Sequence, residues 1–192
     1  MEQMPLVSGK SAVARSSGRE LTPQTIGTIN TDDDTRRLST GINDLNTVLG
    51  GGILPGGVVL LAGQPGIGKS TLLLQLSSYI AKTHPVLYAS GEESAAQVKL
   101  RAERLGANGS DKLAFVASTS ADDIAATIRS GKYKLVIIDS IQTLTLDEIT
   151  SAPGSVSQIT NSSNVIIQAA KSSGAAVVLV GHVTKEGSIA GP

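Results

Sequence analysis

The fold of this chain is decided by residues 60–71, which have the sequence Leu-Leu-Ala-Gly-Gln-Pro-Gly-Ile-Gly-Lys-Ser-Thr. An apolar run at 58–61 leads into Gly-x-x-x-x-Gly-Lys-Ser, and a leucine-rich run follows at 72–76. This order of strand, glycine-rich loop and helix is typical of a phosphate-binding P-loop. Glycines let the backbone wrap tightly and turn its N–H groups toward a polyphosphate, and the positive end of the following helix favours an anion.

The P-loop therefore predicts a nucleotide site. Lys69 is expected to reach the β- and γ-phosphates and so to assist catalysis, and the Ser70 hydroxyl is expected to ligate Mg²⁺. The alternative is a glycine-rich turn without a ligand, which the flanking strand and helix disfavour. The loop residues expected to contact the nucleotide are Gly63, Gln64, Pro65, Gly66, Ile67, Gly68, Lys69, Ser70 and Thr71.

Composition excludes several classes of protein. The 192 residues carry 16 basic and 16 acidic side chains, so any DNA-binding surface must be a local patch. Without cysteine, this chain has no disulfide framework and no thiolate zinc site. With one Phe and three Tyr, base stacking cannot be the main nucleic-acid mode. No apolar run approaches the roughly 20 residues of a membrane span, so we expect a cytoplasmic protein without a membrane partner.

Two parts are expected along the chain. Residues 1–36 are rich in Ser, Thr, Gly, Arg and Asp without an apolar period, and they predict a flexible linker. From residue 37 to 192 strands and helices alternate, starting with a short helix capped by Ser39 or Thr40 that presents Ile42, Leu45, Val48 and Leu49 on one face. This alternation predicts an α/β fold, a mostly parallel central sheet with helices on both faces. Strands are expected at 58–61, 85–89, 113–117, 134–139 and 175–180, and the main helices at 69–81, 95–105, 122–129 and 155–171.

Carboxylates follow two of these strands, where parallel sheets bind their ligands. Asp139 ends an apolar run and is expected to hold Mg²⁺ together with Ser70, the alternative being a cap of the next turn. Glu92 and Glu93 come after the second strand, and we expect Glu92 to be the catalytic base, with Glu93 as the substitute. The alternative is that both simply favour the positive end of the next helix.

Other polar residues at the same end are weaker candidates. His182 and Gln142 are expected to contact the nucleotide near its γ-phosphate, although a lone histidine is more often a surface residue. Segments 147–157 and 184–192 could touch a polymer, but their only basic residue is Lys185. Charge alone therefore leaves DNA binding by these segments unsupported.

The motifs together resemble the bacterial RadA (Sms) family. They include Ser-Gly-Glu-Glu-Ser at 90–94, Asp-Ser-Ile-Gln-Thr at 139–143 and Gly-His-Val-Thr-Lys-Glu-Gly at 181–187, besides 49–56, 63–75, 99–105 and 153–158. The resemblance implies a RecA-like P-loop NTPase core that binds ATP and Mg²⁺ and forms hexameric rings. It also implies ATP-driven work on recombination intermediates in DNA repair, alongside other recombination proteins. Segments 147–157 and 184–192 would then face single-stranded or branched DNA.

The chain departs from the family pattern in three ways. The four-cysteine zinc module is absent, and so are the Lys-Asn-Arg-Phe-Gly motif and the Lon-protease-like domain. At 159–161, Ile-Thr-Asn replaces the usual Val-Arg-Glu. We therefore expect a core truncated at its C-terminal end, with an uncovered apolar strand edge and weak hydrolysis. Two other hypotheses stay open: a KaiC-like ATPase that acts on protein partners, and a nucleotide-binding module that does not hydrolyse.

Overall fold

The computed structural model describes residues 21–28, 36–107 and 109–183 of the 192-residue chain. The chain falls into two units, Met1–Thr31 and Asp32–Pro192. In the first unit the described residues contain one turn of 3-10 helix, η1, at Ile26–Thr28. The expected linker at 1–36 lies mostly outside the described residues and remains a prediction.

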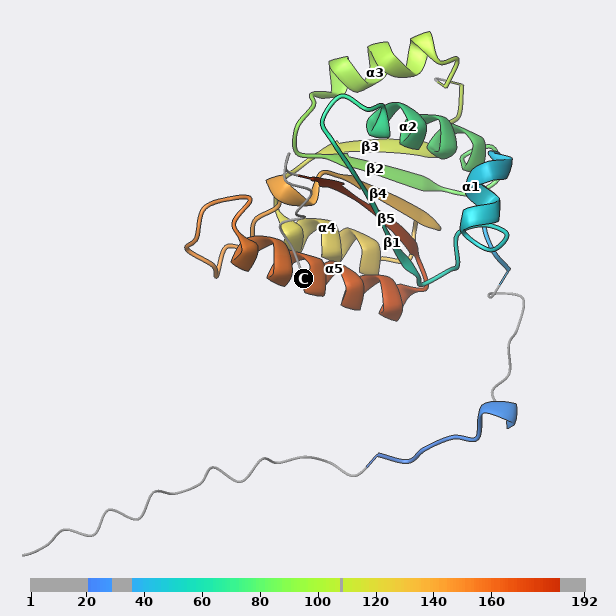
Figure 1. Cartoon of the computed structure of the whole chain (residues 1–192), viewed down its shortest axis with the longest axis vertical. Coiled ribbons are helices and arrows are strands. Elements are labelled where there is room, and N and C mark those ends of the chain that lie inside the picture. The colour runs from blue at the N-terminus through green and yellow to red at the C-terminus, as the bar shows by residue number, and fades with distance from the viewer. Residues whose placement is uncertain (1–20, 29–35, 108, 184–192) are drawn as a thin grey trace, which may run out of the picture. The chain divides into compact units, whose positions relative to one another are not determined.

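The second unit is built on a five-stranded sheet (Figure 1). The strands lie in the order β1-β5-β4-β2-β3, and every neighbouring pair is parallel. The predicted α/β class with a parallel central sheet is therefore confirmed. The strand bounds are β1 Val58–Gly63, β2 Val86–Ser90, β3 Leu113–Ala117, β4 Leu135–Asp139 and β5 Ala176–His182.

Helices cover both faces of the sheet, with α2 and α3 on one side and α4 and α5 on the other (Figure 1). Each main helix runs back from the carboxyl end of one strand to the amino end of the next, as parallel strands require. Among the described residues, no helix combines the length and apolarity that a membrane span needs. The helix bounds are α1 Asn43–Val48, α2 Lys69–Ile80, α3 Ala95–Arg104, α4 Ala121–Arg129 and α5 Val156–Ser173, with a 3-10 turn η3 at Ile141–Thr143.

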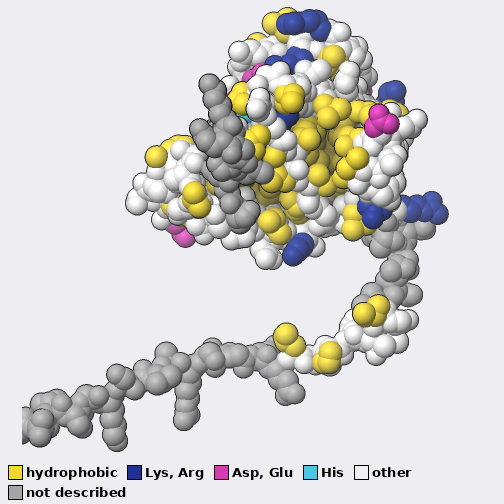
Figure 2. Space-filling model, viewed as in Figure 1, with side chains coloured by type: hydrophobic (Ala, Val, Ile, Leu, Met, Phe, Trp, Pro, Cys, Tyr) yellow, Lys and Arg dark blue, Asp and Glu magenta, His cyan; other side chains and the backbone are white. Residues whose placement is uncertain are grey.

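The buried strands divide their side chains between two hydrophobic cores. In β4, Val136 and Ile138 pack with α4 and α5, whereas Leu135 and Ile137 pack with α2 and α3. All five β4 residues are buried, because both faces of the strand are covered by helices. By contrast β1 is an edge strand, and its Leu60 is 50% exposed. Figure 2 shows hydrophobic side chains gathered on this side of the unit.

The expected cap of the first helix is wrong. The N-cap residue of α1 is Ile42, which makes no side-chain cap, and Val48 is 82% exposed instead of facing the core. Thr40 is fully buried and contacts the Asn46 side-chain oxygen at 2.7 Å. A turn through Gly41, whose φ of 75° lies in the left-handed region, separates Thr40 from the helix. The threonine therefore pins this turn and does not cap the helix.

Candidate functional site

The P-loop lies at the carboxyl end of the sheet, between the end of β1 and the start of α2. Gly66 and Gly68 have φ of 79° and 100°, a conformation that side-chain-bearing residues rarely adopt. Gly68 is the N-cap of α2 and supplies no side-chain cap. The first N–H groups of a helix have no intrahelical acceptor, so this end of α2 is suited to a polyphosphate. Residues 64–68 are exposed to solvent.

Lys69 is 8% exposed, and its ammonium group is held by the loop itself. Nζ donates to the carbonyl oxygens of Gly63 and Gln64, each at 2.9 Å. It also lies 3.2 Å from Nδ1 of His182, at the end of β5. Because an ammonium group can only donate, this Nδ1 accepts, and the imidazole proton is placed on Nε2. The lysine and the histidine, 113 residues apart in sequence, are therefore directly joined.

His182 connects the P-loop to Glu92. Its Nε2 lies 2.9 Å from Glu92 Oε1, and the Ser140 hydroxyl donates to the same oxygen at 2.5 Å. Partial burial raises the pKa of the Glu92 carboxyl, but the hydrogen bonds from Ser140 and His182, with the positive charge of Lys69, outweigh it and lower the pKa. A contact chain Lys69–His182–Glu92–Ser140 thus joins the P-loop after β1 to the ends of β5, β2 and β4, and Glu92 carries a negative charge within it.

The neighbouring Glu93 is directed to another partner. Its two carboxylate oxygens accept from both terminal nitrogens of Arg101 on α3, at 2.6 and 2.5 Å. The hydrogen bond to Glu93 raises the pKa of the Arg101 guanidinium, so this guanidinium stays charged. Of the two candidate bases, Glu92 is thus the one connected to the P-loop, and Glu93 is engaged with α3.

Asp139 is buried at the end of β4, with 4% of its surface exposed. Its Oδ2 accepts from the Tyr88 hydroxyl at 2.7 Å. Burial raises the pKa of Tyr88 and the Asp139 carboxylate raises it further, so Tyr88 stays a phenol and donates. Ser70 lies in the first turn of α2, partly exposed. Within the described residues, no group of three or more His, Cys, Asp or Glu side chains could hold a metal ion.

Gln142 lies in η3 beside the end of β5. Its Nε2 donates to the His182 carbonyl oxygen at 3.3 Å, and its Oε1 is buried without a hydrogen-bond partner among the described residues. Buried side-chain oxygens are rarely left unpaired, so this oxygen suits a contact with a water molecule or a bound ligand. The two weaker sequence candidates, Gln142 and His182, are therefore brought together.

Sequence reasoning missed three side chains that hold this site. Ser140 donates to Glu92, Tyr88 to Asp139, and Arg101 to Glu93. The position of Ser140, directly after Asp139, could have signalled it. Tyr88 is the only side chain with a hydroxyl in the interior of the buried second strand, and such a group needs a partner. Nothing local signals Arg101, because its pairing depends on how α3 docks.

Of the two segments expected to contact a polymer, the structure describes one. Segment 184–192 lies outside the described residues. In segment 147–157, the loop before α5 is fastened by the buried Gln158, whose amide donates to the carbonyl oxygens of Ile149 and Ser151 at 2.9 and 3.2 Å. Its charged residues are Asp147 and Glu148, so this loop presents negative charge only.

The fold and the site define a P-loop nucleotide-binding protein of the α/β class. Over residues 25–188 the chain matches the family described as "AAA domain", and it belongs to that family.

Curated relatives at high identity are named DNA repair protein RadA. One from Halalkalibacterium halodurans is 52% identical over 88% of this chain and 37% of its own length. Those from Pseudomonas aeruginosa and Streptococcus pneumoniae are 44% and 43% identical over the whole chain, which covers 41% and 45% of their lengths. The resemblance to RadA is thereby confirmed, and the chain spans less than half the length of these relatives.

Proposed function

We propose that this chain is the Mg²⁺-dependent, ATP-hydrolysing core of a DNA-dependent ATPase that processes recombination intermediates in DNA repair. The observation that carries the proposal is the contact chain Lys69–His182–Glu92, which links a phosphate-binding lysine to a negatively charged carboxylate. The names of the relatives support DNA repair as the setting. As in ring ATPases, a neighbouring subunit would complete the site.

The residues at the carboxyl end suit the binding of Mg·ATP. Lys69 would exchange the carbonyl oxygens of Gly63 and Gln64 for phosphate oxygens, while the start of α2 receives the polyphosphate. Ser70 and Asp139 would hold Mg²⁺, which needs only one or two protein oxygens beside phosphates and waters. The ion, when bound, neutralises charge that develops on the phosphates.

The same residues suit hydrolysis. Glu92 would orient and deprotonate the attacking water, a task for which its lowered pKa keeps it ionised at neutral pH. Moving Lys69 onto a phosphate would remove its contact with His182, so that His182 and Gln142 respond to the γ-phosphate. Nucleotide occupancy would in this way be transmitted to Glu92.

Steady-state ATP turnover, with and without single-stranded DNA, tests the proposal. Glu92→Gln is expected to lower turnover by about 100-fold or more, because general bases contribute that much. Glu103→Gln, an exposed glutamate of α3, is the matched control and should keep the parent's rate. Unchanged turnover in Glu92→Gln would remove Glu92 as the base.

The same assay separates the other hypotheses. Stimulation by a protein fraction and not by DNA would favour a KaiC-like ATPase. Nucleotide binding without any turnover, in an assembled ring as well, would favour a module that does not hydrolyse.

A further inference from the structure

We propose that the amino end of the sheet, opposite the nucleotide site, binds the phosphate backbone of DNA. The proposal rests on the proposed function for the identity of the polyanion as DNA, and it assigns that DNA a surface. The alternation of strand and helix brings the C-termini of the helices and the loops that precede β2, β3, β4 and β5 to this one end.

Backbone hydrogen bonds fasten the loops at this end side by side. The N–H of Val86 donates to Lys112 O at 2.8 Å, and Lys134 N donates to Pro85 O at 2.9 Å. Ala176 N in turn donates to Lys134 O at 2.9 Å. Charges that are distant in sequence are therefore neighbours on one rigid surface, which is what a nucleic-acid backbone requires.

Basic side chains gather at this end. Figure 2 shows Lys and Arg side chains on the side of the unit where α2 and α5 end in Figure 1. The carboxylates described at the same end are Asp44, Glu103 and Asp111. We call the following set of residues the amino-end basic surface: Arg37, Lys82, Arg104, Lys112, Arg129, Lys132 and Lys171.

The groups that hold these cations in place leave their charge intact. The Lys112 ammonium donates to Thr83 O at 3.0 Å, and Arg37 donates to Leu49 O at 2.9 Å. The Lys82 ammonium lies over the Tyr79 ring, 5.4 Å from its centre. Carbonyl oxygens and an aromatic ring are uncharged, so these partners orient the cations without cancelling their charge.

The helix dipole explains the position of only some of these cations. Arg104, Arg129 and Lys171 lie in the last turns of helices, or at their ends, where a cation favours the negative end of the helix dipole. Lys112 and Lys132 lie in the loops that lead into β3 and β4, beyond the C-caps of α3 and α4, where the dipole does not require them. Lys82 directly follows Ala81, the C-cap of α2, so the dipole accounts for part of its placement. Lys112 and Lys132 therefore carry the proposal, with Lys82 as a third cation at this end.

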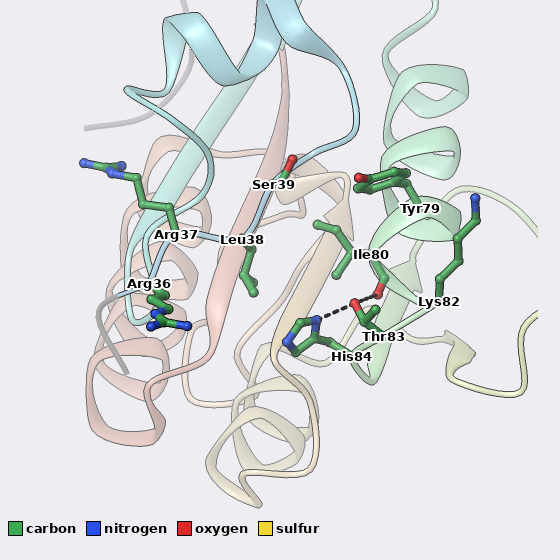
Figure 3. Close-up of a pocket in the computed structure, with 9 residues that line it drawn as sticks. All are labelled: Arg36, Arg37, Leu38, Ser39, Tyr79, Ile80, Lys82, Thr83 and His84. Atoms are coloured by element: carbon green, nitrogen blue, oxygen red, sulfur yellow. Dashed lines mark hydrogen bonds between the residues drawn. The ribbon is translucent and has the colours of Figure 1, made fainter. Parts of the chain in front are cut away.

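The surface is also hollowed beside Lys82. A cavity of about 490 Å³ lies between residues 36–39 and the end of α2. Figure 3 shows Leu38, Ile80 and the His84 ring directed toward its centre, with Lys82 and Tyr79 at one side. An apolar floor beside a cation suits a sugar or an unpaired base whose phosphate rests on the lysine.

Outside the nucleotide site, the carboxyl end of the sheet suits a nucleic-acid backbone poorly by comparison. Among the residues that the structure describes at this end, Lys69 and Arg101 are the cations, and both are engaged in the site. Asp147 and Glu148 would repel a phosphate backbone at the loop before α5, and Asp122 and Asp123 would repel it at the start of α4.

Fluorescence anisotropy with a labelled, mixed-sequence single-stranded DNA tests the proposal on the whole chain. In the triple variant Lys82→Gln, Lys112→Gln, Lys132→Gln, affinity should fall at least about tenfold at 50 mM salt. The slope of log K against log salt should shrink by about 2, since each contact to a single strand contributes about 0.7. Two single variants, Lys132→Gln and the exposed Lys99→Gln of α3, each remove one positive charge, but only Lys132 lies on the amino-end basic surface. If the position of the charge matters, only Lys132→Gln should weaken DNA binding.

Two outcomes would overturn the proposal. One is an unchanged affinity and salt slope in the triple variant, and the other is a parent chain that binds no DNA. Calorimetry with Mg·ATP on the same samples distinguishes the second outcome from failure of the proposed function, because nucleotide binding depends on the opposite end of the sheet. It also verifies that the variants are folded.

Discussion

The two ends of one sheet differ in how they are built. At the carboxyl end, side chains from the start of α2, the end of β5 and the turn after β2 contact one another directly, as Lys69, His182 and Glu92 do. At the amino end, loop lysines such as Lys82 and Lys112 contact uncharged groups and keep their charges for solvent or a ligand. The first arrangement suits chemistry on one small ligand, and the second suits a long polyanion. A parallel sheet can in this way keep the two tasks at opposite ends.

Among the four changes that compare the two ends, removal of the His182 imidazole should have the largest effect, because it breaks the carboxyl-end contact chain. His182→Ala is expected to lower ATP turnover about tenfold or more, since Glu92 loses the group that orients it. His182→Gln, which can still donate to Glu92, should recover part of the rate. Steady-state kinetics of the two variants measure this, and equal rates for alanine and glutamine would exclude a positioning role.

A substitution that disturbs packing at the carboxyl end should lower the stability of the fold. In Gly91→Ala the added Cβ would come within 2.7 Å of Thr143 Cβ, and it would also overlap the Thr143 hydroxyl. Neither atom is the end of a long flexible side chain, so we expect a loss of about 1–3 kcal/mol in unfolding free energy. Urea unfolding measures it. Gly109→Ala, where a Cβ meets nothing within 4 Å, is the control and should be nearly neutral.

The charge of Glu92 should make stability depend on pH. Its folded-state pKa lies below the unfolded value of 4.5, so the stability that its contacts give is present above that value and is lost as the pH falls through the folded pKa. The difference in Tm between the parent and Glu92→Gln should therefore narrow from pH 7 to about pH 3. Thermal unfolding at several pH values measures it, and a difference that widens in acid would contradict the assignment.

The smallest expected effect is that of the amino-end lysines on nucleotide affinity at the carboxyl end. The triple lysine variant at the amino end should bind Mg·ATP with the parent's Kd, within about twofold, because its charges lie a strand length from the P-loop and are screened by salt. Calorimetry checks this. A large loss of nucleotide affinity would show that the two ends are coupled, and the comparison would then fail.

Most of the fold was predictable from the sequence. The apolar run in β4 and the P-loop context of β1 fixed the sheet type, and the expected strand at 113–117 coincides with β3. The cap of α1 was not predictable, because Ser39 and Thr40 look like cap residues while the Gly41 turn removes them from the helix. The geometry of this turn sets where α1 begins, and a turn leaves no periodic pattern in the sequence.

The site was predictable as a set of positions but not as a set of contacts. Glu92 and His182 were expected at the carboxyl end because both follow strands. Their pairing depends on the strand order, which places β5 between β1 and β4, and residue spacing does not determine that order. The basic surface at the amino end could not be predicted either, because its lysines are scattered in the sequence and come together only through the strand order. The formal net charge of zero gave no hint of it.

The most direct test of the central claim is calorimetric titration of Mg·ATP into the parent chain and into Lys69→Ala, with the exposed Lys99→Ala as control. We expect a Kd in the micromolar range, a binding free energy of about −8 kcal/mol, for the parent and Lys99→Ala, and no measurable binding for Lys69→Ala. Equal affinity in the parent and Lys69→Ala, or no binding by the parent, would contradict it.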